Sequence, residues 1–204
     1  MQQYLRLIVK SFQTSIERRG KCVAVAFTSS LPKEGVSHVV ESFGLELAQR
    51  TGKQTLIVDA RRLQSLSVVD YIRMPQCCYQ PDTANLWLLP LEETGETVRD
   101  GSERYLQLQM NPNEESEFGL GNVQALRIIF DYVLIDCPAL SVSDDAAILA
   151  SSVDGVVVVV EADKTNQEQI SRTRQTLEMA NGKLLGLVLN KRQYPVPKWL
   201  YKRL

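Results

Sequence analysis

Six short apolar segments alternate with polar or helical stretches along the chain, and this alternation limits the fold more than any other feature. The segments cover residues 22–28, 54–60, 85–90, 132–136, 156–160 and 184–190. Unbroken apolar runs of this length are typical of strands covered on both faces of a parallel sheet. Between them, apolar residues recur at helical spacing over 39–48, 122–130 and 166–180. This order predicts an α/β fold with right-handed crossovers, in which a doubly wound, mostly parallel sheet carries helices on both faces.

Two further regions flank or interrupt the alternation. Residues 2–18 place apolar side chains three and four apart, which predicts an amphipathic N-terminal helix. The stretch 92–121 is polar and weakly periodic, so we expect a surface excursion that contains a helix. No repeat or low-complexity linker divides the 204 residues, and a 44% hydrophobic composition can supply one core. We therefore treat 1–204 as a single domain.

Charge is balanced overall but uneven along the chain. The 23 Lys and Arg residues against 24 Asp and Glu residues give a net charge of -1, which disfavours nucleic acid as a partner of the whole domain. The tail 191–204 holds five basic and no acidic residues, so it carries +5 and the remainder -6. Trp199 and Tyr201 lie among those bases. Such a tail suits a membrane surface or a membrane partner, and it equally suits a solvated helix end.

Sequence patterns also favour a cytoplasmic location. No segment reaches the roughly 18 uncharged apolar residues of a membrane span, and residues 2–18 lack the pattern of a signal peptide. The four cysteines, Cys22, Cys77, Cys78 and Cys137, make no disulfide framework. We expect them to be reduced, with redox activity of the adjacent pair Cys77–Cys78 as an open alternative.

Hydroxyl and carboxylate side chains follow three of the predicted strands. The loop 29–37 follows the first strand, and Asp59 and Asp136 end the second and the fourth. Because ligands of open α/β sheets bind at the carboxyl ends of the strands, these residues are candidates for one site. A loop leading into a helix offers backbone N–H groups to phosphate, and a hydroxyl such as Ser37 can bind magnesium beside an aspartate. The simpler alternative is that both aspartates face solvent or cap the next helix.

Four segments carry a resemblance to a known family. They are Thr28–Ser37, Leu56–Ala60, Tyr132–Pro138 and Leu187–Lys191. In order and spacing they resemble the motifs of the bacterial tyrosine kinases (BY-kinases) of capsule and exopolysaccharide export. That family falls within the MinD/ParA-like P-loop ATPases. The resemblance implies a P-loop NTPase fold, use of ATP or ADP with Mg²⁺, and transfer of phosphate to tyrosine.

Matching positions imply roles for individual residues. Ser37 and Asp136 match the magnesium ligands, and Asp59 and Asp136 match the catalytic carboxylates. The nucleotide-binding positions are Ser30, Lys33, Glu34, Gly35, Ser37, His38 and, near the adenine, Asn190.

The sequence departs from the family motifs where charge matters most. Val36 stands where the phosphate-binding lysine is expected, and Lys33 replaces a glycine of the loop. Only Gly35 of the eleven glycines lies in this loop. Arg61 replaces the second aspartate of an Asp-Ala-Asp motif, unless a two-residue deletion leaves Arg61 and Arg62 as the family's arginines. Losing a lysine and a carboxylate is expected to cost several powers of ten in phosphoryl transfer.

Three hypotheses fit these observations. The first is a degenerate kinase, a pseudoenzyme that regulates a membrane polysaccharide chain-length or export partner. The second is an active tyrosine autokinase or ATPase whose phosphate-binding lysine has moved to Lys33 or to a neighbouring subunit. The third, a partition-type ATPase, is disfavoured because Leu31 occupies the position of that group's extra loop lysine. A homo-oligomer, contact of the tail with the membrane surface, and phosphorylation of Tyr194 or Tyr201 stay open.

Overall fold

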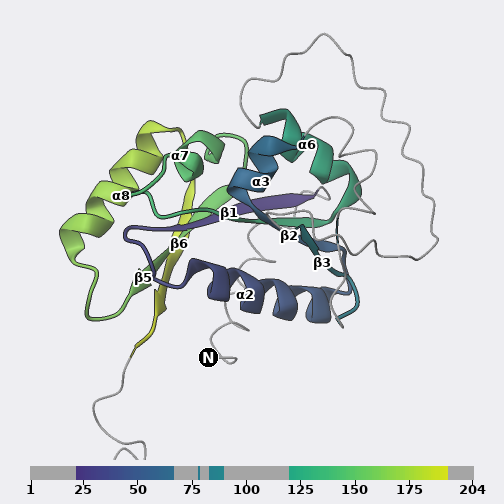
Figure 1. The fold of residues 1–204 in the computed structure, drawn as a ribbon, viewed down its shortest axis with the longest axis horizontal. Helices are drawn as coiled ribbons and strands as arrows, with labels where there is room; N and C mark the ends of the chain where they lie inside the picture. The colour runs from purple at the N-terminus through teal and green to yellow at the C-terminus, as the bar shows by residue number, and fades with distance from the viewer. Residues whose placement is uncertain (1–21, 67–77, 79–82, 90–119, 193–204) are drawn as a thin grey trace, which may run out of the picture.

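A six-stranded sheet forms the centre of the molecule (Figure 1). The structure is a computed structural model, and it describes residues 22–66, 78, 83–89 and 120–192. The strands are β1 (Val23–Ser29), β2 (Thr55–Asp59), β3 (Leu86–Leu89), β4 (Tyr132–Asp136), β5 (Gly155–Glu161) and β6 (Leu184–Asn190). Their spatial order is β3-β2-β4-β1-β5-β6, and every neighbouring pair is parallel. The predicted α/β fold with a parallel sheet is confirmed.

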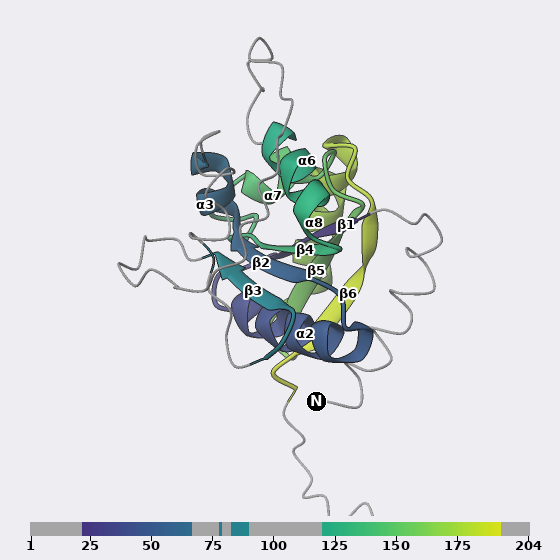
Figure 2. The same ribbon diagram turned by 90° about the vertical axis from the view of Figure 1, so that its right-hand side faces the viewer.

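Helices cover both faces of this sheet, as Figures 1 and 2 show. One face is covered by α2 (Val36–Thr51). The other is covered by α3 (Ala60–Ser65), α6 (Leu120–Ile129), α7 (Asp145–Leu149) and α8 (Gln167–Met179). In the described part of the chain, no helix combines the length and apolar character needed to cross a bilayer.

The core consists of two apolar layers, one on each side of the sheet. All seven residues of β1 are buried, which explains the unbroken apolar run in its sequence. Successive side chains of a strand point to opposite faces, so Val25 and Phe27 pack under α2 while Ala24 and Ala26 face the other layer. The rings of Phe27 and Phe43 lie 5.5 Å apart, centroid to centroid, and join α2 to the centre of the sheet.

The direction in which the chain adds strands to the sheet reverses between β1 and β4, and this reversal positions the site. From β1 the chain crosses one face through α2 to β2, whereas from β4 it crosses the other face through α7 to β5. In open α/β sheets two such connections leave a crevice at the carboxyl ends of the strands, where ligands bind, and here these are the ends of β1 and β4. The loop after β1 and Asp136 at the end of β4 both lie at this switch point.

Several predicted regions fall outside the described residues. They are the N-terminal helix 2–18, most of the excursion 92–121, and the tail beyond Arg192, with Tyr194 and Tyr201. Cys77 lies outside as well, while Cys22, Cys78 and Cys137 are free thiols. Burial raises the pKa of the Cys22 thiol to about 12, and burial also raises that of Cys137, so neither is a reactive thiolate at neutral pH.

Candidate functional site

The loop after β1 leads directly into the N-terminus of α2. Gly35 occupies the position before the helix with φ of 90°, in the left-handed region that glycine adopts readily. Lys33 also has a positive φ, of 67°, although it stands where the resembled motif has glycine. No side chain caps the first turn of α2. The first N–H groups of the helix therefore have no acceptor from an N-cap side chain, and such groups at a helix N-terminus can bind an anion.

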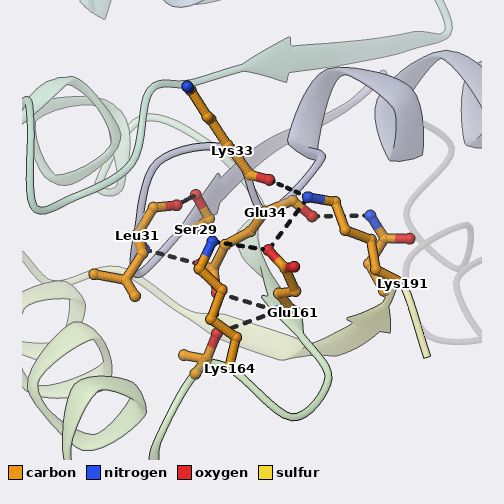
Figure 3. Close-up of polar contacts among 9 residues, drawn as sticks. Ser29, Leu31, Lys33, Glu34, Glu161, Lys164 and Lys191 are labelled. Atoms are coloured by element: carbon orange, nitrogen blue, oxygen red, sulfur yellow. Dashed lines mark hydrogen bonds and ion pairs between the residues drawn. The ribbon is translucent and has the colours of Figure 1, made fainter. Parts of the chain in front are cut away.

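Glu34 is fully buried, and its carboxylate holds this loop in place (Figure 3). One carboxylate oxygen accepts the Leu31 N–H at 2.8 Å, which closes the loop on itself. The other accepts the Glu161 N–H at 3.1 Å, from the last residue of β5, and the hydroxyl of Thr165, from the segment that follows. A buried carboxylate that accepts from three donors is a rigid support, because moving the loop would break all three hydrogen bonds.

Asn190, at the end of β6, supports the same loop. Its side-chain amide donates to the Glu34 carbonyl at 2.8 Å. A Cβ added to Gly35 would lie only 2.4 Å from that amide nitrogen. Glycine at position 35 is thus required both by its backbone angle and by the closeness of Asn190. The predicted contact of Asn190 with adenine stays a prediction, since the amide nitrogen braces the loop in this structure.

Lys191 closes the network on the solvent side. Its ammonium donates to the backbone carbonyl of Lys33 and lies 3.2 Å from the Glu161 carboxylate. Lys164 pairs with the same carboxylate at 3.1 Å. The two ammonium groups, Lys164 first, lower the pKa of Glu161. The loop is therefore tied to both β5 and β6 through side chains.

Neither of the two residues that depart from the loop motif supplies a cation to this network. Val36 is buried and belongs to the apolar layer under α2. The Lys33 side chain is exposed, and in Figure 3 it points away from Glu34, Glu161 and Lys191. The loop thus keeps its backbone support while lacking an inward lysine at position 36.

The other predicted nucleotide-binding positions have different environments. Ser30 is buried, and its hydroxyl oxygen accepts a hydrogen bond from the Thr173 hydroxyl on α8 at 2.8 Å. His38 is exposed on the first turn of α2. Ser30 therefore joins the loop to α8, whereas His38 is accessible from solvent.

Asp59 and Asp136 lie side by side, as the sequence predicted. They are paired in register at the carboxyl ends of β2 and β4. Burial raises the pKa of Asp136, and the negative charge of Asp59 adds to this effect. A hydrogen bond from the Ser37 hydroxyl and the positive charge of Arg61 act in the opposite direction. The structure thus brings Ser37, Asp59 and Asp136 together at one edge of the sheet.

Arg61 donates hydrogen bonds to both carboxylate oxygens of Asp59. Its backbone N–H donates to Oδ1 at 2.8 Å, which makes Asp59 the N-cap of α3. Its guanidinium adds Nε to Oδ1 at 3.1 Å and Nη2 to Oδ2 at 2.9 Å. Asp59 therefore does cap the next helix, the simpler alternative for this residue, and both of its oxygens are engaged.

These residues do not fit Mg²⁺ in this arrangement. Magnesium needs several oxygen ligands in a nearly octahedral set. The Ser37 hydroxyl is bonded to Asp136, and Asp59 is paired with Arg61. Across the residues that the structure describes, no group of three or more His, Cys, Asp or Glu side chains is placed to hold a metal ion.

Sequence reasoning missed Glu161, Thr165 and Lys191. All three lie at or just past the carboxyl ends of β5 and β6, the same edge that drew attention to Asp59 and Asp136. Extending that rule to every strand would have included them. Glu34, which accepts from Glu161 and Thr165, is 127 residues from Glu161 in the chain, so no local pattern connects them.

Comparison with known proteins identifies relatives along most of the chain. No family model matches it. Tyrosine-protein kinase CpsD of Streptococcus agalactiae is 27% identical over 190 residues, 89% of this chain and 81% of the relative. Tyrosine-protein kinase YwqD of Bacillus subtilis is 26% identical over 202 residues, 93% and 80% respectively. The succinoglycan biosynthesis transport protein ExoP of Rhizobium meliloti is 28% identical over 182 residues, 82% of this chain and 22% of that longer protein.

Solved structures give the same result for the fold. The kinase domain of the Escherichia coli tyrosine kinase ETK superposes with a TM-score of 0.67 at 16% identity, covering 95% of this chain and 78% of that one. The cell division protein MinD of Aquifex aeolicus superposes with a TM-score of 0.58 at 19% identity, covering 89% and 73%. Over most of its length the chain is therefore similar to bacterial proteins named as tyrosine-protein kinases, and its fold is the MinD/ParA-like P-loop fold shared by the kinase domain and MinD.

Proposed function

We propose that this chain is a pseudoenzyme of exopolysaccharide or capsule biosynthesis that regulates a membrane chain-length or export protein. The proposal rests on position 36, where the side chain expected to contact the β- and γ-phosphates is a valine packed into the core. The kinase relatives imply use of nucleotide with Mg²⁺ in general, and Ser30, Gly35 and Ser37 keep the positions for it. Without a lysine at position 36, backbone dipoles alone must balance the phosphate charge.

The support of the loop favours a scaffold role. Glu34, Asn190 and Lys191 hold the loop in shape through hydrogen bonds within the protein. A loop that is already rigid can present a fixed surface to a partner, because it does not lose conformational entropy on binding. One relative is named as a biosynthesis transport protein, which supports a partner in polymer export. On this proposal the chain works at the cytoplasmic face of the membrane.

Calorimetric titration with Mg-ATP tests the loss of nucleotide chemistry. We expect no binding at micromolar concentrations for the native chain and for Lys33→Ala. Val36→Lys restores the missing cation and should create measurable binding, whereas Val36→Met, which adds length without charge, should not. Micromolar binding by the native chain that disappears in Lys33→Ala would instead support an active kinase or ATPase with a relocated lysine.

Complementation tests the regulatory role. In a strain lacking this protein, polymer length would be measured after expression of the native chain, Ser37→Ala or Asp136→Asn. A pseudoenzyme needs no phosphoryl transfer, so both variants should restore the native length distribution. Failure of both variants, with normal protein levels, would contradict the proposal.

A further inference from the structure

The carboxylate side of the site already contains a positive charge. Asp59 and Asp136 end neighbouring strands in register, so two carboxylates face the same edge of the sheet. Like charges this close repel unless a cation lies between or beside them. In this chain Arg61, the second residue of α3, supplies one.

The contact between Arg61 and Asp59 is extensive for two residues so near in sequence. Nε and Nη2 reach different carboxylate oxygens, at 3.1 and 2.9 Å, in the forked geometry that suits guanidinium and carboxylate. The backbone N–H of Arg61 adds a third bond, at 2.8 Å. Because α3 starts immediately after Asp59, its first turn fixes Arg61 next to that carboxylate.

We propose that Arg61 is a built-in cation that takes the place of a divalent metal at the Asp59–Asp136 edge and excludes such metals from it. A metal entering there must compete with the guanidinium for the Asp59 oxygens. Its double charge is also repelled by the guanidinium even when the side chain swings into solvent. Arg61 is thus a specificity-determining residue: whatever binds at this edge of the sheet binds without a divalent metal.

The proposal goes beyond loss of catalysis, because it concerns the metal and not the nucleotide or the partner. Val36 alone would account for weak phosphate binding and leaves the metal edge unaffected. Arg61 acts at the opposite side of the crevice, on a different ligand. The two can therefore be tested separately.

Titration with Mn²⁺, followed by electron paramagnetic resonance of the free ion, tests the inference on the full chain without nucleotide. We expect weak binding by the native chain and at least about tenfold tighter binding by Arg61→Ala, equivalent to about 1.4 kcal/mol. Arg61→Asp should bind more tightly still, because it adds a carboxylate. Arg61→Lys keeps the charge without the two-nitrogen contact of the guanidinium, and its gain in Mn²⁺ affinity should be smaller than that of Arg61→Ala.

Two controls locate the effect. Arg172→Ala removes an arginine that also pairs with a carboxylate, Glu168, on the exposed surface of α8, and it should leave Mn²⁺ affinity unchanged. Asp59→Asn in the Arg61→Ala background should abolish the gain. Native binding as tight as that of Arg61→Ala, or a gain that survives Asp59→Asn, would overturn the inference.

Failure of this inference is distinguishable from failure of the proposed function. If the native chain transfers phosphate and Arg61→Ala still binds Mn²⁺ more tightly than the native chain, only the pseudoenzyme proposal is overturned. Absence of the gain in a chain that does not bind ATP would overturn the role of Arg61 alone. Unchanged circular dichroism of the variants would exclude misfolding as the cause.

Discussion

The two sides of the candidate site differ in how they are held and in what has changed. On the loop side, the fully buried Glu34 accepts bonds from its own loop and from the end of β5, and Asn190 adds a bond from β6. On the carboxylate side, Asp59 and Asp136 are partly exposed and Arg61 mostly so. The loop side is therefore held by buried side chains, whereas the carboxylate side carries an exposed arginine.

This difference follows from the cost of changing each side. A buried polar network resists substitution, because every lost partner leaves a donor or acceptor unsatisfied. An exposed charged side chain can be replaced by one of the opposite charge at small cost in stability, because water solvates the new side chain and its former partner. The loop can therefore keep its shape without a lysine at position 36, while an exposed charge such as that of Arg61 can change at small cost.

The largest effect should come from Glu34→Ala. Removing this carboxylate leaves the Leu31 N–H and the Thr165 hydroxyl without their acceptor, while the Glu161 N–H keeps only the Thr165 hydroxyl oxygen. Each unsatisfied buried donor costs roughly 1–3 kcal/mol, so we expect a loss of about 3 kcal/mol in the free energy of unfolding. Chemical denaturation measures it. Glu34→Gln keeps the shape and one carbonyl oxygen and should lose about half as much; no loss in Glu34→Gln would mean that packing, not hydrogen bonding, holds the loop.

Gly35→Ala should be the next most damaging change. Alanine at φ of 90° is strained, and its Cβ would lie 2.4 Å from the amide nitrogen of Asn190. We expect a loss of about 2 kcal/mol, because the side chain of Asn190 must leave the Glu34 carbonyl. Gly52→Ala is the matched control: φ is also positive, at 64°, but a Cβ there meets nothing within 4 Å. Its loss should be limited to about 1 kcal/mol of backbone strain, and equal losses at both positions would rule out the Asn190 clash.

The sequence predicted the sheet and the shared edge well, for physical reasons. β4 and β6 have the predicted bounds, 132–136 and 184–190, because each is an apolar run that ends at a polar residue. The adjacency of Asp59 and Asp136 follows from the rule that carboxyl ends of parallel strands meet. The short helices α3 and α7 were not predicted, since five or six residues contain less than two turns of periodicity.

The loop network could not be predicted in the same way. Its contacts join residues more than a hundred positions apart, such as Glu34 and Glu161, and neither residue is unusual in its local sequence. The pairing of Arg61 with Asp59 depends on where α3 begins, which the sequence did not reveal. The departures at Val36 and Arg61 were evident in the sequence. Their consequences could be judged only from the structure, which shows that the Val36 side chain is buried and that the Arg61 side chain pairs with Asp59.

Asp136→Asn should stabilise the protein at neutral pH. Burial and the charge of Asp59 raise the pKa of Asp136 in the folded state, so the contribution of this group to stability is greatest below its ordinary pKa of 3.8 and is lost as pH rises through the folded pKa. Asparagine carries no charge and can still accept the Ser37 hydroxyl. We expect a gain on the order of 1 kcal/mol at pH 7 that disappears below pH 3.8. Denaturation of both proteins across this range measures it, and a gain independent of pH would contradict the electrostatic cause.

Arg61→Ala should have the smallest effect on stability, in contrast to its effect on metal binding. The Arg61 side chain is 58% exposed, and such ion pairs contribute less than about 0.5 kcal/mol. The cap of α3 survives the substitution, because the donor to Asp59 is the backbone N–H of residue 61. Asp59→Ala removes that cap and should cost about 1 kcal/mol in the same denaturation experiment. A loss in Arg61→Ala as large as in Asp59→Ala would mean that the arginine is retained for folding, and the contrast between a structural loop side and a variable carboxylate side would no longer hold.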